Sequence, residues 1–353
     1  MGAPLMPAPF GTTPDGTPAS LYTLVNRNGL TVKVTDYGGI ITELHVPDRH
    51  GVLADIAHGF DGVAPYCGDV PYFGALIGRY GNRIARGRFE LDGRTVQLDV
   101  NNGNHHLHGG EQGFHKVLWK VKPFTTAESA GLVLTYFSRD GEQGFPGNLQ
   151  VEVRYELNNS DELRVQYRAT TDQPTPVNLT QHTYFNLAGQ GDALGHLLKI
   201  HAQRYIPIDA ESIPLGELAP VDDTPFDFRT PHVIGERIGA DHAQLKNGLG
   251  YDHNWVLDKP APGLLALAAT LSEPRFGRVL ELYTREPGLQ FYSGNFLDGT
   301  LDGKGRTYDY RSGICLEPQH FPDSPNNPSY PNTILRPGET YSTESLYRFS
   351  TLP

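Results

Sequence analysis

The clearest pattern in the chain is a strict alternation of apolar and polar residues in its middle. Every second residue is apolar from Leu149 to Leu157, and the alternation resumes from Leu163 to Ala169. A short polar stretch, Asn158 to Asp161, separates the two runs. A period of two on both sides of a polar turn is typical of an antiparallel hairpin with one buried face. The sequence therefore predicts two long paired strands here.

A second hairpin is predicted around Asp92-Gly93, which Phe89-Glu90-Leu91 and Val96-Gln97-Leu98 flank. Asp-Gly suits a type I′ turn, in which both central residues take a positive φ. Gly or Pro interrupts most windows that are long enough to hold a helix. Shorter apolar runs predict further strands at Leu30–Val34, Leu132–Phe137, Leu197–His201, Val279–Tyr283 and Leu289–Tyr292.

Composition extends this picture to the whole chain. The 353 residues include 40 Gly and 28 Pro without a periodic Gly-X-Y pattern, which indicates many turns between short strands. We expect an all-β fold, a large antiparallel β-sandwich with few short helices. Without a repeat or an obvious linker, we expect one domain over residues 1–353. Residues 1–16 are expected to be a flexible segment, and the Pro-rich stretch 213–231 a long loop.

Charge and cysteine content narrow the possible partners. The net charge is −11 and there are no long basic runs, which argues against nucleic acid and anionic membranes. The only cysteines, Cys67 and Cys315, form no close pair, so a disulfide framework and a cysteine zinc site are not expected. The N-terminus lacks the basic start and apolar run of a signal peptide. We expect a cytoplasmic protein, either monomer or homodimer.

Polar residues flanked by Gly and aromatic residues gather in five segments. This setting is typical of sugar sites, although Asp252 alone could cap a turn and Arg83 could be a surface ion-pair partner. No nucleotide-binding, nucleophile-elbow or Cys-x-x-Cys motif accompanies them, which favours proton transfer by His and carboxylates. The segments are Gly78–Arg83, Asn104–Gly110, Asn178–Asn186, Gly250–Trp255 and Cys315–His320.

A metal site is the main alternative for the cluster His105, His106 and His108. Adjacent histidines on an extended chain point to opposite faces, and no carboxylate lies at a useful spacing. We therefore expect neither a metal nor a cofactor.

Read in order, these segments resemble the aldose 1-epimerases, also called galactose mutarotases. The resemblance runs from Asp36-Tyr37-Gly38-Gly39 to Leu335-Arg336-Pro337-Gly338-Glu339. Five blocks in the family's order make it specific. They are Gly81-Asn82-Arg83-Ile84, Leu107-His108-Gly109-Gly110, Asn178 through Leu187, Asp252-His253-Asn254 and Leu316-Glu317.

The resemblance implies a large β-sandwich that interconverts the α and β anomers of free aldohexoses such as galactose and glucose. It also implies that Glu317 is the general base and His182 the general acid. Two positions depart from the family: Gln181 replaces the usual Asn, and His320 stands where an aromatic residue is common. The positions matching the sugar-binding residues are Asn82, Arg83, His108, Tyr184, Asp252 and Gln290.

Anomer exchange needs one proton to leave the C1 hydroxyl while the ring oxygen gains another. A carboxylate and an imidazolium on opposite sides of the C1–O5 bond suffice, and each positioned transfer is typically worth about 10²–10⁴-fold. The sequence therefore predicts a bell-shaped pH profile, with a carboxyl on the acid limb and a histidine on the basic limb.

Three other functions remain possible on these residues. A glycosidase would use Asp252 and Glu317 as a carboxylate pair across a glycosidic bond. A non-catalytic sugar sensor would keep Asp252 and Arg83 but would not need Glu317 and His182 together. A relative acting on hexose 6-phosphates should show more basic residues near the site than Arg83.

Overall fold

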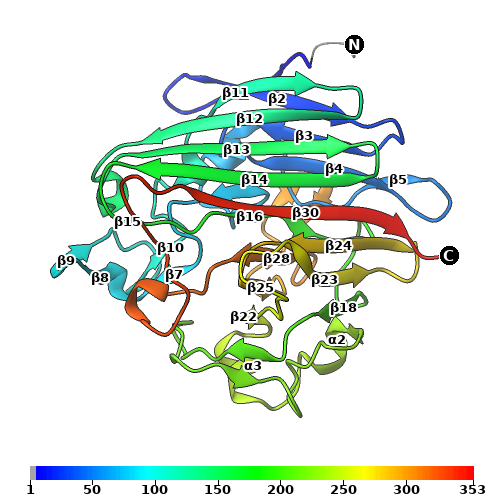
Figure 1. Cartoon of the computed structure of the whole chain (residues 1–353). Coiled ribbons are helices and arrows are strands. Elements are labelled where there is room, and N and C mark those ends of the chain that lie inside the picture. The colour runs from blue at the N-terminus through cyan, green and yellow to red at the C-terminus, as the bar shows by residue number, and fades with distance from the viewer. Residues whose placement is uncertain (1–4) are drawn as a thin grey trace.

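The computed structural model describes residues 5–353, and its largest element is a sheet of nine antiparallel strands. Figure 1 shows the long strands lying side by side across the molecule. In spatial order they are β11 (Lys120–Thr125), β12 (Ser129–Ser138), β13 (Leu149–Asn158), β14 (Glu162–Thr171), β30 (Tyr341–Thr351), β24 (Arg278–Thr284), β23 (Ala266–Ser272), β18 (Leu197–Ile200) and β21 (His232–Val233).

Both predicted hairpins are confirmed. Buried and more exposed residues alternate along β13 and β14, which pair from Leu149 opposite Thr171 to Leu157 opposite Leu163. In the smaller hairpin, β8 (Arg88–Leu91) pairs with β9 (Arg94–Gln97). Its turn residues have φ of +50° at Asp92 and +77° at Gly93, the signs that a type I′ turn requires.

A second sheet of five strands packs behind the first, and Figure 1 shows it in blue. Its Val32 and Leu44 share one buried core with Leu134 and Val153 of the large sheet. Burial of facing apolar sides is what joins two sheets into a sandwich. The strands are β1 (Ala8–Thr12), β2 (Pro18–Val25), β3 (Thr31–Thr35), β4 (Ile41–Pro47) and β5 (Leu53–Asp55).

A third sheet of six strands has two chemically different faces. Trp255, Leu289 and Leu316 point from one face into the core. Successive side chains of a strand point to opposite faces, so the residues between them form a separate face. The strands are β17 (Tyr184–Phe185), β28 (Ile314–Gln319), β25 (Gly288–Tyr292), β22 (Asp252–Val256), β19 (Arg204–Ile206) and β20 (Ala219–Pro220).

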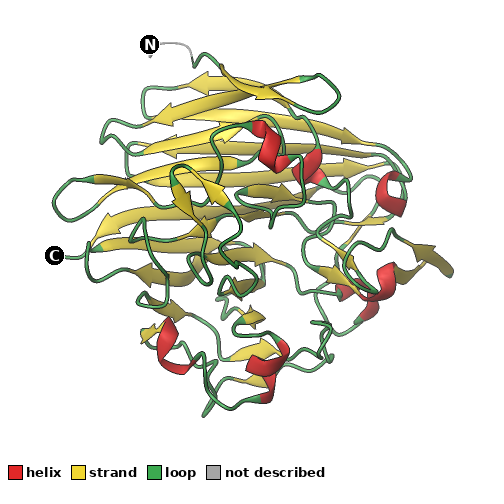
Figure 2. Cartoon of the chain, turned by 180° about the vertical axis from the view of Figure 1, so that it is seen from behind, coloured by secondary structure: helices red, strands yellow, loops and turns green. Residues whose placement is uncertain are grey.

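Small ladders and short helices connect the sheets, and Figure 2 shows how little helix there is. The remaining paired strands are β6 (Ala75–Ile77) with β16 (Thr180–His182), β7 (Arg83–Ile84) with β10 (His106–Leu107), β15 (Thr175–Pro176) with β29 (Ile334–Leu335), and β26 (Asp302–Gly303) with β27 (Arg306–Thr307). The α-helices are α1 (Val63–Tyr66), α2 (Ile234–Arg237) and α3 (Ala243–Asn247). Single 3₁₀ turns cover Ala85–Gly87, Phe114–Lys116, Glu142–Gly144 and Ser324–Asn326. None of the described helices has the length and hydrophobicity that crossing a membrane requires.

The expectation of a flexible segment over residues 1–16 is wrong for Ala8–Thr12, which form β1. This strand pairs with β2, and the Phe10 ring is buried against Tyr66 at a centroid distance of 6.3 Å. Pairing and burial stabilise a segment whose composition alone suggests a loose end. Residues 1–4 of the expected segment lie outside the described residues. The predicted loop over residues 213–231 is confirmed, because it contains only the two-residue strand β20.

Candidate active site

The polar face of the six-stranded sheet carries three of the predicted site residues, Asp252, Gln290 and Glu317. Asn254 of β22 lies opposite Gln290 of β25, which lies opposite Glu317 of β28. Asp252 and Cys315 are two positions away on their strands and therefore share this face. Strand register thus brings together residues that are more than sixty positions apart in the sequence.

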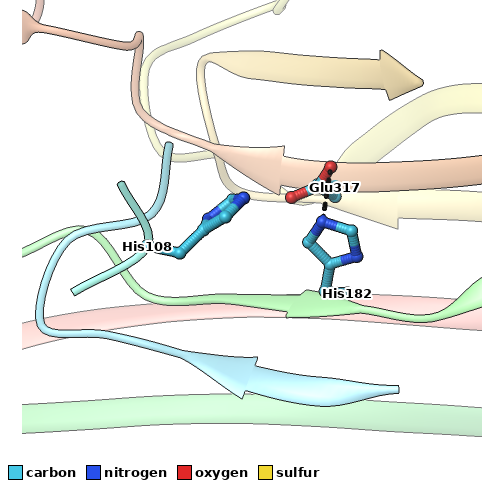
Figure 3. Close-up of side chains that lie close together, drawn as sticks. All are labelled: His108, His182 and Glu317. Atoms are coloured by element: carbon cyan, nitrogen blue, oxygen red, sulfur yellow. Dashed lines mark ion pairs between the residues drawn. The ribbon is translucent and has the colours of Figure 1, made fainter. Parts of the chain in front are cut away.

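Glu317 and His182 meet at the centre of this face. His182 ends β16, and its Nε2 lies 3.6 Å from Oε1 of Glu317, the contact drawn as a dashed line in Figure 3. The side chains are only 5% and 3% exposed. The other carboxylate oxygen, Oε2 of Glu317, is buried without a hydrogen-bond partner among the described residues. Two proton-exchanging groups are therefore in direct contact and shielded from water.

Burial shifts the two groups in opposite directions. It raises the pKa of Glu317 well above its usual range, and the negative charge of Asp252 adds to the shift while Arg83 opposes it. Burial lowers the pKa of His182 to about 4, partly offset by a hydrogen bond to its own backbone. The expected order, a carboxyl on the acid limb and a histidine on the basic limb, assigns each limb to a single group and stays a prediction. The opposite shifts favour a pair that holds one proton, and the limbs of the pH profile would then belong to the pair.

His108 completes the cluster from a neighbouring loop, as Figure 3 shows. Its ring packs edge-on against His182, with centroids 5.1 Å apart. The backbone N–H of Asn82 donates to Nδ1 of His108 at 3.1 Å, and the N–H of His108 donates to the carbonyl of Asn82 at 3.2 Å. Because Nδ1 accepts this bond, neutral His108 carries its ring proton on Nε2.

Gly109 explains why the His108 loop can lie so close to its neighbour. Its φ is +87°, and a Cβ at this position would lie 1.8 Å from the carbonyl oxygen of Gly78. A side chain is therefore excluded both by backbone conformation and by space. This close approach holds the His108 loop against the segment that carries Asn82.

Asp252, Gln290 and Arg83 form the other side of the site. Nε2 of Gln290 donates to Oδ1 of Asp252 at 2.7 Å, while Oε1 of Gln290 is buried without a partner. Burial raises the pKa of Asp252, and Arg83 and Gln290 oppose the shift. Nε of Arg83 donates to Oδ1 of Asn102 at 3.2 Å. A small cavity is lined by these residues together with Asn82 and Asn254.

Tyr184, which the sequence predicts to bind sugar, packs against His182. Its ring is 2% exposed and stacks on the imidazole of His182, with centroids 5.3 Å apart and an interplanar angle of 30°. It does not line the cavity beside Asp252. In this structure Tyr184 supports the ring of His182.

Three further residues of the site were not identified from the sequence. Cys315 lies with Sγ 3.5 Å from Nδ1 of His182, and the Tyr72 ring packs against His108 at 4.7 Å. Both polar atoms of the Asn254 side chain are buried without partners among the described residues. Strand alternation is a signal that could have found Cys315 and Asn254, since each is two positions from a predicted site residue.

Neither departure from the family pattern faces the reacting pair. Gln181 precedes His182 on its strand and points the other way, where its Nε2 donates to the carbonyl of Gly74 at 2.7 Å. Nδ1 of His320 lies 2.6 Å from Oε2 of the buried Glu286. That ion pair borders a groove of about 930 Å³, which lies over β14 and β30 and contains none of the predicted sugar-binding residues.

The three clustered histidines occupy separate environments. His105 lies 3.4 Å from Glu211, and Nδ1 of His106 donates to the carbonyl of Asp99 at 2.7 Å. The expectation that no carboxylate lies near these histidines is wrong for His108, because Glu317 is its neighbour in space. Potential ligand atoms of His108, His182 and Glu317 all lie within 4.8 Å of one another. By distance alone this trio could hold a cation. The nearby positive charge of Arg83, which acts on both Glu317 and His108, disfavours one.

Comparison with known proteins supports what the fold and site indicate. The family model described as aldose 1-epimerase matches residues 20–348. The chain belongs to the aldose 1-epimerase family. It is 44% identical to the galactose mutarotase of Rattus norvegicus over 344 residues, covering 97% of both chains. It is 40% identical to the aldose 1-epimerase of Escherichia coli strain K12, covering 95% of this chain and 96% of that one.

Solved structures of the family have the same architecture. The crystal structure of galactose 1-epimerase from Lactobacillus acidophilus NCFM superimposes with a TM-score of 0.87 at 30% identity. The match covers 98% of this chain and 99% of that one. The all-β sandwich predicted from the sequence is therefore confirmed as an aldose 1-epimerase fold.

Proposed function

We propose that this enzyme interconverts the α and β anomers of free aldohexoses such as galactose and glucose. The observation that carries the proposal is the buried contact between Glu317 and His182, which lie 3.6 Å apart. One group able to accept a proton and one able to donate it are the minimum that ring opening requires. Family membership supports the same reaction.

The reaction begins when C1 and O5 of the sugar lie within reach of both groups. The carboxylate of Glu317 takes the proton of the C1 hydroxyl, and protonated His182 gives a proton to the ring oxygen O5. The C1–O5 bond breaks and leaves the open-chain aldehyde. The proton needed on His182 is one transfer away from the resting pair, across the contact that Glu317 already makes.

Ring closure reverses the roles. The C1–C2 bond rotates in the open chain, His182 takes the proton back from the C5 hydroxyl, and Glu317 returns a proton to the new C1 oxygen. The product is the other anomer, and the enzyme regains its starting protonation state. Because water is excluded from the site, the electrostatic interactions of both groups with the reacting atoms are stronger than they would be in solution.

The remaining site residues hold the sugar in this account. The cavity-lining residues exchange hydrogen bonds with hydroxyls on one side of the sugar, and His108 acts from the other. The cavity-lining residues in question are Asn82, Arg83, Asp252 and Gln290. Arg83 is the only Lys or Arg that lines the cavity, which favours a neutral sugar over a hexose phosphate. The close pairing of Glu317 with a histidine favours anomer exchange over a two-carboxylate glycosidase.

We also propose that the chain works as a single domain in the cytoplasm, as a monomer or homodimer. Its partner is then a small monosaccharide, without nucleic acid or membrane. The net charge of −11 supports the absence of polyanionic partners.

The direct test is polarimetry of freshly dissolved α-galactose and α-glucose, with and without the protein. The proposal predicts that optical rotation reaches the same final value in both cases, but far sooner with protein. An unchanged approach to equilibrium at micromolar protein would rule the function out, and binding of the same sugars would then identify a sensor.

A further inference from the structure

Two residues of one strand contact the two ring nitrogens of His182. Glu317 faces Nε2 at 3.6 Å, and Cys315 faces Nδ1 with its Sγ at 3.5 Å. The two residues are separated by one position on β28, so their side chains leave the same face of the strand. A single strand therefore determines the surroundings of both nitrogens.

The thiol of Cys315 is fully enclosed in this arrangement. Cys315 is 0% exposed, and burial raises the pKa of its thiol well above the usual range, so the sulfur stays neutral. Tyr184 lies directly opposite Cys315 in the strand register and stacks on the imidazole of His182. Stacking on Tyr184 thus fixes the plane of the His182 ring, and the sulfur of Cys315 lies against its Nδ1 edge.

We propose that Cys315 is a positioning residue that accepts the Nδ1–H of His182 and so keeps Nε2 as the nitrogen that exchanges protons with the sugar. The inference rests on the proposed function. Throughout the cycle Nδ1 keeps its proton, and only Nε2 gains and loses one. If the neutral ring carried its proton on Nε2 instead, no lone pair would face O5 and the second half of the reaction would stop.

A thiol suits this task because it is a weak acceptor. The second nitrogen of a catalytic histidine often faces a carboxylate or a carbonyl, which stabilises the imidazolium. A carboxylate at this position would make protonated His182 a weaker acid. Neutral sulfur fixes the tautomer without that penalty.

The protonation states of the other groups near His182 also bear on its tautomer. Burial lowers the pKa of His108 and of His115, so both histidines are neutral at any pH above these lowered pKa values. Burial raises the pKa of the phenols of Tyr72 and Tyr184. The groups that face His182 besides Cys315 are Glu317, His108, His115, Tyr72 and Tyr184.

The test compares Cys315→Ala, which removes the acceptor, with Cys315→Ser, which keeps a weak one. Cys67→Ala is the matched control, because Cys67 is the other cysteine and its thiol donates to the carbonyl of Val63. The ¹⁵N NMR signals of His182, assigned by their loss in His182→Asn, report the tautomer. Polarimetry gives kcat and KM for each variant.

Wild type is expected to show the Nδ1–H tautomer. Cys315→Ala should give a mixture of the two tautomers and lower kcat about 10-fold at unchanged KM. Loss of the partner that orients a metal-binding histidine has an effect of this size on activity. Cys315→Ser should restore the tautomer and most of kcat, and Cys67→Ala should resemble wild type.

Several results would overturn the inference. One is an Nε2–H tautomer in neutral wild-type His182, a result that needs no Cys315 variant and holds even if Cys315→Ala fails to fold. Another is a fall in kcat without any change in the ¹⁵N signals, which would make Cys315 a packing residue. Inactive wild-type protein would instead refute the proposed function, so the two failures are distinguishable.

Discussion

Glu317 and His182 illustrate how burial, rather than residue type, sets acid–base behaviour in this site. An exposed glutamate would be ionised at neutral pH, but here burial and the charge of Asp252 raise its pKa while burial lowers that of His182. The pair therefore holds one proton over a wide pH range. With two protons it has no base, and with none it has no acid.

The pH dependence of kcat/KM follows from this proton count. As pH falls through about 4, the pKa given by burial of His182, a second proton enters the pair and activity is lost. As pH rises through the raised pKa of Glu317, the last proton leaves and activity is lost again. Polarimetry from acid to alkaline pH should place the acid limb near pH 4. An acid limb near 6.5, the value of an exposed histidine, would contradict the assignment.

Asp252→Asn tests the sugar-holding role at the same scale. Loss of a charged acceptor typically costs about 1.5–3 kcal/mol, so kcat/KM should fall roughly 10–100-fold, by different amounts for galactose and glucose. The basic limb should also move to lower pH, because the negative charge that raises the pKa of Glu317 is gone. Equal losses for both sugars with unchanged KM would mean that Asp252 takes part in proton transfer instead.

Chelation tests whether the trio His108, His182 and Glu317 acts through a cation. We expect polarimetric activity to survive EDTA, because the proposed reaction uses Glu317 and His182 as proton carriers and a bound cation would occupy both. Enzyme dialysed without EDTA is the control. Loss of activity on chelation that zinc restores would show that the trio is a metal site.

At the scale of elements, the long strands were predictable and the catalytic ones were not. Alternation over about ten residues made β13 and β14 evident. The strand of His182, β16, has three residues, and β10 beside His108 has two. Periodicity cannot be read from so few positions. These strands form because partners distant in sequence, β6 and β7, pair with them.

Gly109→Ala tests how the His108 loop is held. The added Cβ would meet the carbonyl of Gly78, so the loop must move and displace His108. Gly93→Ala is a matched control, because Gly93 has a similar φ of +77° but no atom within 4 Å of the added Cβ. Strain at positive φ, about 1 kcal/mol, should affect both variants in urea unfolding, while only Gly109→Ala should also lose mutarotation. Equal activity in the two variants would contradict the close approach.

At the scale of the whole molecule, composition and alternation predicted the class of fold, whereas the site required long-range pairing. Sequence blocks located Glu317, His182 and Asp252, and the family resemblance added Gln290. The structure brings all four onto or beside one polar face. Cys315 and Asn254 share that face and lie within two of the polar segments, and strand alternation could have added them to the site. Which side chains they meet depends on the strands beside β28 and β22, and local sequence does not contain that information.

The central claim is that Glu317 and His182 exchange protons with the sugar, and one measurement tests it most directly: the polarimetric mutarotation rate of Glu317→Gln. Glutamine keeps the shape of the site and most hydroxyl contacts but cannot accept the C1 proton. We predict a fall in kcat of about 10²–10⁴-fold while galactose still binds. His182→Asn should match it, and the double variant should be little worse, because the two groups act in one step. Mutarotation at the wild-type rate in Glu317→Gln would contradict the mechanism, whatever the fold.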